Sequence, residues 1–201
     1  MVAPDSPVAP LGPAELDAAI ATLTAAFCRD PMYHALIPDE NARRPWVEFL
    51  MAGLVRAAGP RALLVGVDGG QSGALYATPS DGSSRFAGLL GLLGPLLHLP
   101  LDKLEWRRAI AVSRAVDKLL PKEPNLHLHV VAVSDAARGR GLGALLVRHA
   151  IEAARGAGRV LHLETTNPEN LPFYRKLGLV VRDEVRCFAE APPLYTLQSP
   201  S

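Results

Sequence analysis

A glycine-rich segment at residues 138–144 constrains this chain more than any other feature. Its sequence is Arg-Gly-Arg-Gly-Leu-Gly-Ala, so glycines alternate with other residues. The run at residues 126–133 that precedes it ends apolar and β-branched, as expected of a strand buried on both faces. Glycines that expose backbone N–H groups at the positive end of a helix can bind a pyrophosphate. Such a helix is predicted by apolar residues at helical spacing: Leu142, Leu145, Leu146, His149, Ala150 and Ala153.

A second distinctive segment follows a further predicted strand at residues 160–164. Asn170 lies three residues before Phe173, and Tyr174 and Lys176-Leu177-Gly178 come next. Taken with Arg138-x-x-Gly141-x-Gly143, this segment resembles the GNAT acyltransferases. In that superfamily the first motif binds the pyrophosphate of acetyl-CoA. In the second motif an Asn holds the cofactor arm and a Tyr faces the thioester sulfur.

Three further segments resemble one branch of these enzymes, the puromycin N-acetyltransferases. They are Pro-Lys-Glu-Pro at residues 121–124, Leu163-Glu164-Thr165 in the second strand, and Asn-Leu-Pro-Phe-Tyr at residues 170–174. The resemblance covers roughly the C-terminal third of the chain. It implies the fold, the cofactor and the reaction, but not puromycin as the acceptor.

The resemblance implies an α/β GNAT fold over residues 1–201 as one domain, with residues 1–12 as a loosely ordered arm. Such a fold has a mixed, mostly antiparallel twisted sheet flanked by helices and split between its fourth and fifth strands. Acetyl-CoA would bind in the split as co-substrate, with no metal. The residues that would contact it are Val131, Ala132, Val133, Arg138, Gly139, Arg140, Gly141, Leu142, Gly143, Ala144, Asn170 and Phe173. For Phe173, apolar packing is the alternative.

Tyr174 is the first candidate for catalysis. The resemblance places it at the thioester sulfur, where its hydroxyl would act as the general acid for the leaving thiolate. A phenol of pKa about 10 is a slightly weak acid for a thiolate near 8.5, yet a hydrogen bond to the developing charge already helps. The oxyanion would be bound by backbone N–H groups of residues 130–133. That requires a bulge or splayed strands, because paired N–H groups are already committed.

The proton of the acceptor ammonium needs a base, and three residues are candidates. His127 and His129 alternate onto one face of their strand and could both point down the acceptor cleft. Glu164 ends the neighbouring strand, where its carboxylate could accept the proton or bind the ammonium. Packing for the histidines, a helix cap for Glu164, or a water relay in place of all three remain alternatives.

The glycine loop also fits a rival pattern. Gly139-x-Gly141-x-x-Ala144 matches the dinucleotide-binding fingerprint, with Glu164 about 20 residues on as a ribose-binding acid. Against it, residues 134–138 separate the strand from the first glycine, and too little chain follows for the remaining strands. The Asn170 to Tyr174 motif would also be left unexplained. A Walker loop is excluded, because no Gly-Lys-Ser/Thr follows.

The acceptor pocket is predicted from segments that carry apolar side chains and few charges. These are a loop at residues 32–39, with Tyr33 and His34 as substrate-binding candidates, and a buried helical run at residues 86–101. Such a pocket, with Glu164 at its base, suits a compact hydrophobic primary amine better than an aminoglycoside or a basic peptide. The alternatives are a protein amine as acceptor, another acyl donor, or a catalytically silent module that senses acyl-CoA.

Local patterns predict the remaining elements. We expect an edge strand or ragged arm before Pro13, and then helices between residues 13 and 30, 46 and 58, and 104 and 120. A hairpin should join residues 63–67 to 73–78 through Asp68-Gly69-Gly70. The chain should end in an antiparallel pair at residues 179–188 and 194–198.

Composition limits the partners. With 21 basic and 20 acidic residues, the net charge is +1, so no general field attracts nucleic acid or a membrane. Cys28 and Cys187 form neither a metal-binding spacing nor a disulfide framework. The first residues lack the basic start and apolar core of a signal peptide, which predicts a cytoplasmic location. We expect a monomer or a homodimer with a small-molecule amine as its partner.

Overall fold

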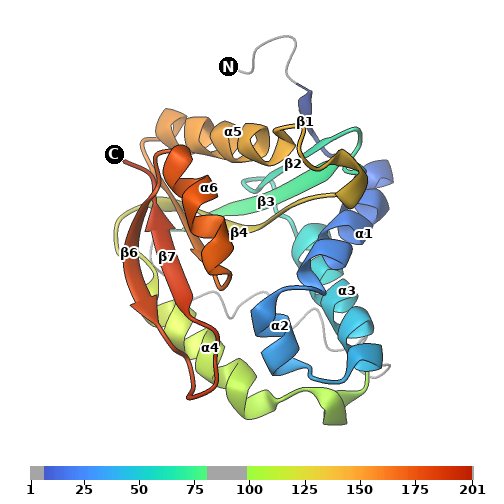
Figure 1. The fold of residues 1–201 in the computed structure, drawn as a ribbon. Helices are drawn as coiled ribbons and strands as arrows, with labels where there is room; N and C mark the ends of the chain where they lie inside the picture. The colour runs from blue at the N-terminus through green and yellow to red at the C-terminus, as the bar shows by residue number, and fades with distance from the viewer. Residues whose placement is uncertain (1–6, 81–98, 201) are drawn as a thin grey trace.

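A seven-stranded sheet forms the centre of the protein (Figure 1), in a computed structural model that describes residues 7–80 and 99–200. The strand order is β1-β2-β3-β4-β5-β7-β6. Only β4 and β5 run parallel, and every other neighbouring pair is antiparallel. This confirms the predicted mixed sheet and rules out the dinucleotide-binding rival, which needs a largely parallel one. The strands are β1 (Val8–Pro10), β2 (Leu63–Val67), β3 (Gly73–Ser80), β4 (Asn125–Val133), β5 (Val160–Thr165), β6 (Val180–Val185) and β7 (Leu194–Gln198).

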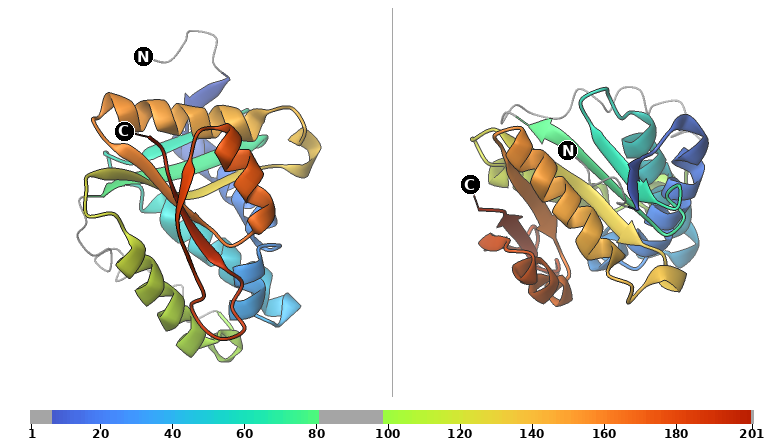
Figure 2. Two further views of the ribbon diagram at one scale, coloured as in Figure 1. Left: turned by 60° about the vertical axis from the view of Figure 1, so that its left-hand side comes forward. Right: turned by 90° about the horizontal axis from the view of Figure 1, so that it is seen from above.

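Helices cover both faces of this sheet, with α5 on one side and α1 and α3 on the other (Figures 1 and 2). No helix in the described ranges is long and apolar enough to span a membrane. Short 3-10 turns occur at Pro13–Glu15, Leu101–Lys103, Asp135–Ala137 and Pro168–Asn170. The α-helices are α1 (Leu16–Phe27), α2 (Pro31–Leu36), α3 (Glu40–Arg56), α4 (Trp106–Leu119), α5 (Leu142–Gly156) and α6 (Leu171–Lys176).

Strand alternation divides the core into two main clusters. On the α5 face, Leu128 of β4 and Leu163 of β5 pack against Leu146 of the helix. On the opposite face, Leu23 of α1 and Met51 of α3 are fully buried against the sheet. Each such side chain contributes about 1.5–3 kcal/mol relative to an exposed one. The two layers hold the middle of β4 rigidly between them.

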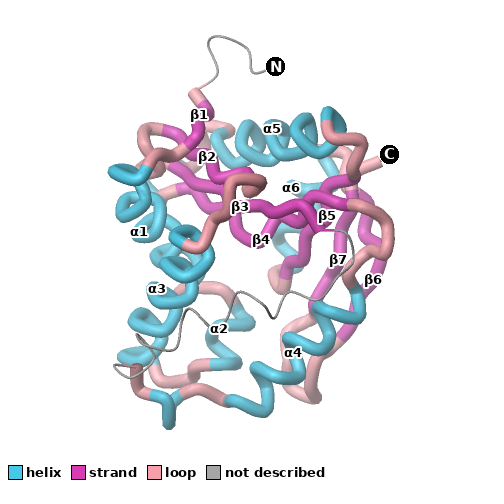
Figure 3. Tube along the Cα trace, turned by 180° about the vertical axis from the view of Figure 1, so that it is seen from behind, coloured by secondary structure: helices cyan, strands magenta, loops and turns pink. Residues whose placement is uncertain are grey.

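An irregularity in β4 decides where the sheet opens. Tyr76 of β3 pairs with Val130 and the next residue, Ala77, pairs with Leu128, so His129 is an extra residue, a β-bulge. The parallel pairing of β4 with β5 reaches Leu128 opposite Leu163 and extends no farther in the described chain. Figure 3 shows the two strands from behind the molecule. Both conditions for free backbone donors on β4, a bulge and a split, are therefore met.

One predicted loop is a helix. Residues 31–36 form α2 where a loop from residue 32 was expected. Asp30 caps this helix by accepting a hydrogen bond from the Met32 N–H at 2.8 Å, and Pro31 occupies its first position, where a missing N–H costs nothing. The expected helical run at residues 86–101 falls mostly outside the described residues, which resume at Leu99.

Candidate active site

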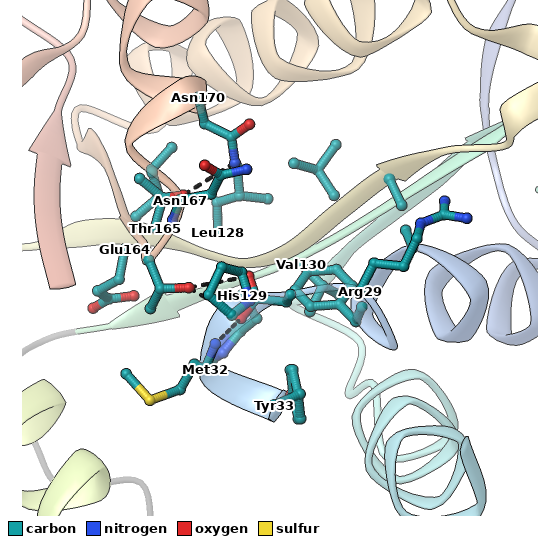
Figure 4. A pocket seen from close by; sticks show the side chains of 18 of the residues that line it. Arg29, Met32, Tyr33, Leu128, His129, Val130, Glu164, Thr165, Asn167 and Asn170 are labelled. Atoms are coloured by element: carbon teal, nitrogen blue, oxygen red, sulfur yellow. Dashed lines mark hydrogen bonds between the residues drawn. The ribbon is translucent and has the colours of Figure 1, made fainter. Parts of the chain in front are cut away.

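A cavity of about 820 Å³ lies at the open end of the β4–β5 split. Its walls come from the α1–α2 segment, from β4, from the end of β5 and from α6. Figure 4 shows Asn167 and Asn170 on one side of β4, and Met32 and Tyr33 on the other. We call the part formed by Val131–Val133, Arg138, Asn170 and Phe173 the cofactor end, because the sequence leads us to expect acetyl-CoA there. The part formed by Asp30–Tyr33, Leu36 and Glu164 is called the acceptor end, because an amine acceptor is expected there.

The glycine loop has the backbone conformation that its sequence predicts. Gly139 and Gly141 both have φ of +76°, a left-handed conformation that other residues adopt only with strain. Gly141 is the N-cap of α5, and no side chain among the described residues caps that helix. The first amide groups of a 15-residue helix are therefore available to an anion. The loop from Gly139 to Ala144 does not itself line the cavity, whereas Arg138 does.

Two arginines lie at the edge of the cavity, beside Asp135 in the segment that precedes the glycine loop. Arg29 and Arg138 both line the cavity, and both pair with Asp135. Arg29 binds that carboxylate with both terminal nitrogens at 2.9 Å, and the contact lowers the pKa of Asp135. All three side chains are more than half exposed, so salt screens these pairs and a phosphate can compete for the arginines. Sequence analysis did not single out Arg29.

The second motif places its aromatic residues at the cofactor end. Asn170 donates from Nδ2 to the Thr165 Oγ1 at 3.1 Å, which ties the 3-10 turn Pro168–Asn170 to the end of β5. Phe173 packs on Tyr174, with ring centroids 5.0 Å apart. The Phe173 ring also lies 3.6 Å from the point where a Cβ would stand if Gly143 had a side chain. Burial, and next the Asp30 carboxylate, raise the pKa of Tyr174 to about 12. Its hydroxyl therefore stays protonated at neutral pH and can donate a hydrogen bond into the cavity that it lines.

Glu164 stands between two histidines. Its Oε2 lies 2.5 Å from Nε2 of His127, and its Oε1 lies 3.0 Å from Nε2 of His162. His127 and His162 are neighbours in the β4–β5 register, and both are almost completely buried. Glu164 lines the cavity, whereas the two histidines do not. The first of these contacts joins two residues that the sequence nominated independently.

His129, the residue at the bulge, faces the cavity. Its Nε2 lies 2.7 Å from the Thr78 Oγ1, and its ring stacks at 4.4 Å from that of His127. The structure thus places His127 and His129 on one face of β4, as their alternation predicts. Only His129 lines the cavity.

Asp30 is a cavity residue that sequence analysis missed. Besides capping α2, its carboxylate accepts a hydrogen bond from the Thr166 hydroxyl at 3.0 Å, which joins the α1–α2 segment to the end of β5. Burial raises the pKa of Asp30, and the Met32 N–H and Thr166 hydroxyl oppose this rise. Its charge in turn helps to raise the pKa of both Tyr33 and Tyr174. The acceptor end therefore carries a second carboxylate besides Glu164.

The two substrate-binding candidates of the α2 region lie in different places. Tyr33 lines the cavity and packs edge-on against Phe27, with ring centroids 6.0 Å apart. His34 is exposed, does not line the cavity, and contacts Arg43 at 3.3 Å. Consecutive residues of a helix point about 100° apart, so the short helix α2 directs only one of them to the cavity.

One cluster in the described ranges has the composition of a metal site. His127, His162 and Glu164 offer three ligand atoms within 4.8 Å of one another. Two observations favour hydrogen bonds over a metal ion. The 2.5 Å contact is shorter than the spacing of two ligands on one zinc, and neither Nδ1 has the hydrogen-bond partner that metal-bound histidines usually have.

Comparison with known proteins agrees with this geometry. The model of the acetyltransferase (GNAT) family matches residues 106–179, which run from α4 through the glycine loop to α6. Glucosamine 6-phosphate N-acetyltransferase 1 of Oryza sativa subsp. japonica is 44% identical over 57 residues, 28% of this chain and 34% of that enzyme. The match thus spans only about a third of the length of that curated relative.

Solved structures resemble almost the whole chain. Arylalkylamine N-acetyltransferase 2 from Aedes aegypti superposes with a TM-score of 0.67 at 12% identity, over 96% of this chain and 97% of that one. The Drosophila melanogaster polyamine N-acetyltransferase gives 0.62 at 18% identity, over 95% and 96%. At these identities the likeness establishes the fold. Residues 106–179 are similar in sequence to the GNAT acetyltransferase family, and the whole chain has the fold of these enzymes; a closer kinship with the puromycin branch stays a prediction.

Proposed function

We propose that this protein transfers the acetyl group of acetyl-CoA to a primary amine of a small molecule. The observation that carries the proposal is the cavity itself. It brings the open β4 backbone, Arg138, Asn170 and Tyr174 together with the carboxylates of the acceptor end. The first four fit the pyrophosphate, the pantetheine arm and the thioester of acetyl-CoA, and the carboxylates fit an ammonium group.

The residues present fit acetyl-CoA by an independent criterion. Gly139 and Gly141 have left-handed backbones and open space where a side chain would stand, so the loop can approach a pyrophosphate closely. Arg29 and Arg138 add exchangeable positive charge at its edge. When bound, the cofactor supplies an activated acetyl group.

The chain's own residues can assist each part of the transfer. Free N–H groups of β4 beyond the bulge could stabilise the oxyanion of the tetrahedral intermediate, a kind of interaction worth about 2.7–4 kcal/mol elsewhere. Tyr174 would donate to the departing sulfur. An alkyl ammonium costs roughly 4 kcal/mol to deprotonate near neutrality, so a base or a water relay must help, and the carboxylates of the acceptor end are placed to do so.

Direct attack of the amine is favoured over a covalent enzyme intermediate. Neither Cys28 nor Cys187 lines the cavity, and burial raises the pKa of both thiols, which disfavours the nucleophilic thiolate. Both substrates would then have to be bound together in a ternary complex.

A small amine is the acceptor that the acceptor end fits. Its wall is apolar at Phe27, Met32 and Leu36, and Asp30 and Glu164 supply negative charge. The relatives described above act on amino sugars, arylalkylamines or polyamines, according to their names. The second carboxylate, Asp30, weakens the sequence-based expectation of a compact hydrophobic primary amine.

A thiol-release assay with acetyl-CoA tests this function. The panel should hold an arylalkylamine, an alkylamine, a linear diamine, glucosamine 6-phosphate, an aminoglycoside and a basic peptide. We expect turnover of at least one of the small amines, with calorimetric binding of acetyl-CoA in the micromolar range. Binding without any turnover would support a silent acyl-CoA sensor instead, and preference for the peptide would support a protein-amine acetyltransferase.

A further inference from the structure

His127, Glu164 and His162 form a hydrogen-bonded row beside the cavity. Leu126 and Leu128 on β4, and Leu161 and Leu163 on β5, pack into the α5 cluster. By alternation, the residues between them point to the opposite face of the sheet. His127 and His162 are directly paired in the register, and Glu164 lies two residues after His162.

Hydrogen-bond geometry assigns the protons of this row. Each Nε2 faces a carboxylate oxygen, at 2.5 and 3.0 Å, and a lone pair there would repel the carboxylate. Each Nε2 therefore carries a hydrogen. The Nδ1 atoms of both rings are buried without a hydrogen-bond partner in the described chain. A second proton on either ring would be a buried donor without a partner in the described chain.

The exposed fractions of the three side chains indicate which of them can contact a substrate. The side chain of Glu164 is 12% exposed, whereas those of His127 and His162 are 3% and 1% exposed. Glu164 lines the cavity and retains acceptor capacity, because each oxygen receives only one of these hydrogen bonds. Of the three, only Glu164 can touch the acceptor.

We propose that Glu164 takes the proton of the acceptor ammonium, and that His127 and His162 are positioning residues that hold its carboxylate toward the cavity. The inference rests on the function proposed above. The ammonium N–H bond breaks and a Glu164 O–H bond forms, which leaves a neutral amine. The amine nitrogen bonds to the acetyl carbon, and the C–S bond breaks. A second nitrogen proton reaches the sulfur through Tyr174, and Glu164 releases its own to solvent.

Of the three candidate bases predicted from the sequence, Glu164 alone keeps that role. His127 becomes a donor to the base and cannot itself meet the substrate. His162, which the sequence analysis did not single out, becomes its partner. Asp30 and His129 also line the cavity. Asp30 caps α2 and binds Thr166, and His129 contacts Thr78, so each has a partner other than the row.

The experiment compares Glu164→Gln with wild type on two acceptors in the thiol-release assay. One is an alkylamine that is cationic at neutral pH, and the other is a fluorinated alkylamine that is already neutral there. We expect kcat/KM to fall about 10²-fold or more with the first and less than about threefold with the second. Equal losses with both acceptors, or no loss, would overturn the assignment. Absence of turnover by the wild type would instead refute the proposed function.

Variants of His162 test positioning. Gln places its amide nitrogen where Nε2 stands, and Asn places it where Nδ1 stands, so His162→Gln should keep kcat within about threefold. His162→Asn should lower it about tenfold without changing the calorimetric Kd for acetyl-CoA. Thermal melts confirm that both variants fold. Equal kcat for the two variants, or stoichiometric zinc in the purified wild type by elemental analysis, would overturn the positioning role.

Discussion

The glycine loop beside the cofactor end is shaped by its backbone, whereas the acceptor end of the cavity is built from side chains. In the loop, Gly139 and Gly141 shape one short stretch of chain before α5. At the acceptor end, Asp30 and Glu164 come from segments far apart in sequence and are linked through Thr166 and β5. A backbone site is encoded locally, so a motif reveals it. A side-chain site depends on register and long-range packing, so it emerges only in the folded chain.

Gly141→Asp is the variant with the largest expected effect, and it tests whether the glycine loop binds the cofactor through its backbone. At φ of +76° an aspartate is strained, and its charge would stand beside the pyrophosphate, so acetyl-CoA affinity should fall about 10³-fold or become unmeasurable. Calorimetry measures this. Gly158→Asp is the matched control, because Gly158 also has positive φ and open space and lies at the far end of α5. Similar losses in both variants would mean that strain alone acts.

Tyr174→Phe should have the next largest effect. The variant keeps the ring that packs on Phe173 but removes the donor to sulfur, so kcat should fall about 10²-fold while the Kd for acetyl-CoA is retained. Because burial raises the pKa of Tyr174 to about 12, its ionisation should lower the wild-type rate only above about pH 11. Unchanged turnover in the variant would show that Tyr174 only packs.

Asp30→Asn tests whether a side-chain charge at the acceptor end contributes to binding of the amine. Asn still caps α2, so the fold should be kept, but the loss of charge should raise the KM for a linear diamine about tenfold. Acetyl-CoA binding should not change. Asp39→Asn serves as control, because Asp39 caps α3 in the same way and does not line the cavity. An equal effect in the two variants would remove Asp30 from the acceptor site.

Much of the fold was predictable from local patterns. The β2–β3 hairpin, the strand-loop-helix of β4 and α5, and the final antiparallel pair all occur where expected. The segment after Asp30 was predicted wrongly, because Asp-Pro was interpreted as the end of one helix. The same pair is also a strong helix start, with an N-cap and Pro at the first position.

The sequence predicted those parts of the candidate site that a short motif encodes, and it missed those that depend on long-range contacts. Asp30 was missed because its contact with Thr166 spans 136 residues, and no local pattern signals it. His162 could have been found, since it lies two residues before Glu164 and shares its face of β5. Its pairing with His127 could not, because the register of a parallel pair depends on the whole crossover. The bulge at His129 is hidden in the sequence because residues 130–133 are all apolar, so the shift in alternation does not stand out.

Because of that bulge, His129 is an extra residue of β4 in the β3–β4 register. Leu126 and Leu128 before it, and Val131 and Val133 after it, all pack toward α5, and the phase of alternation shifts by one at the extra residue. Deleting His129 would restore an uninterrupted apolar rhythm, and with it a β3–β4 ladder without gaps. The chain therefore carries one residue more than its architecture requires, and a shortened strand would yield a well-folded relative that has lost the backbone donors proposed above for the oxyanion.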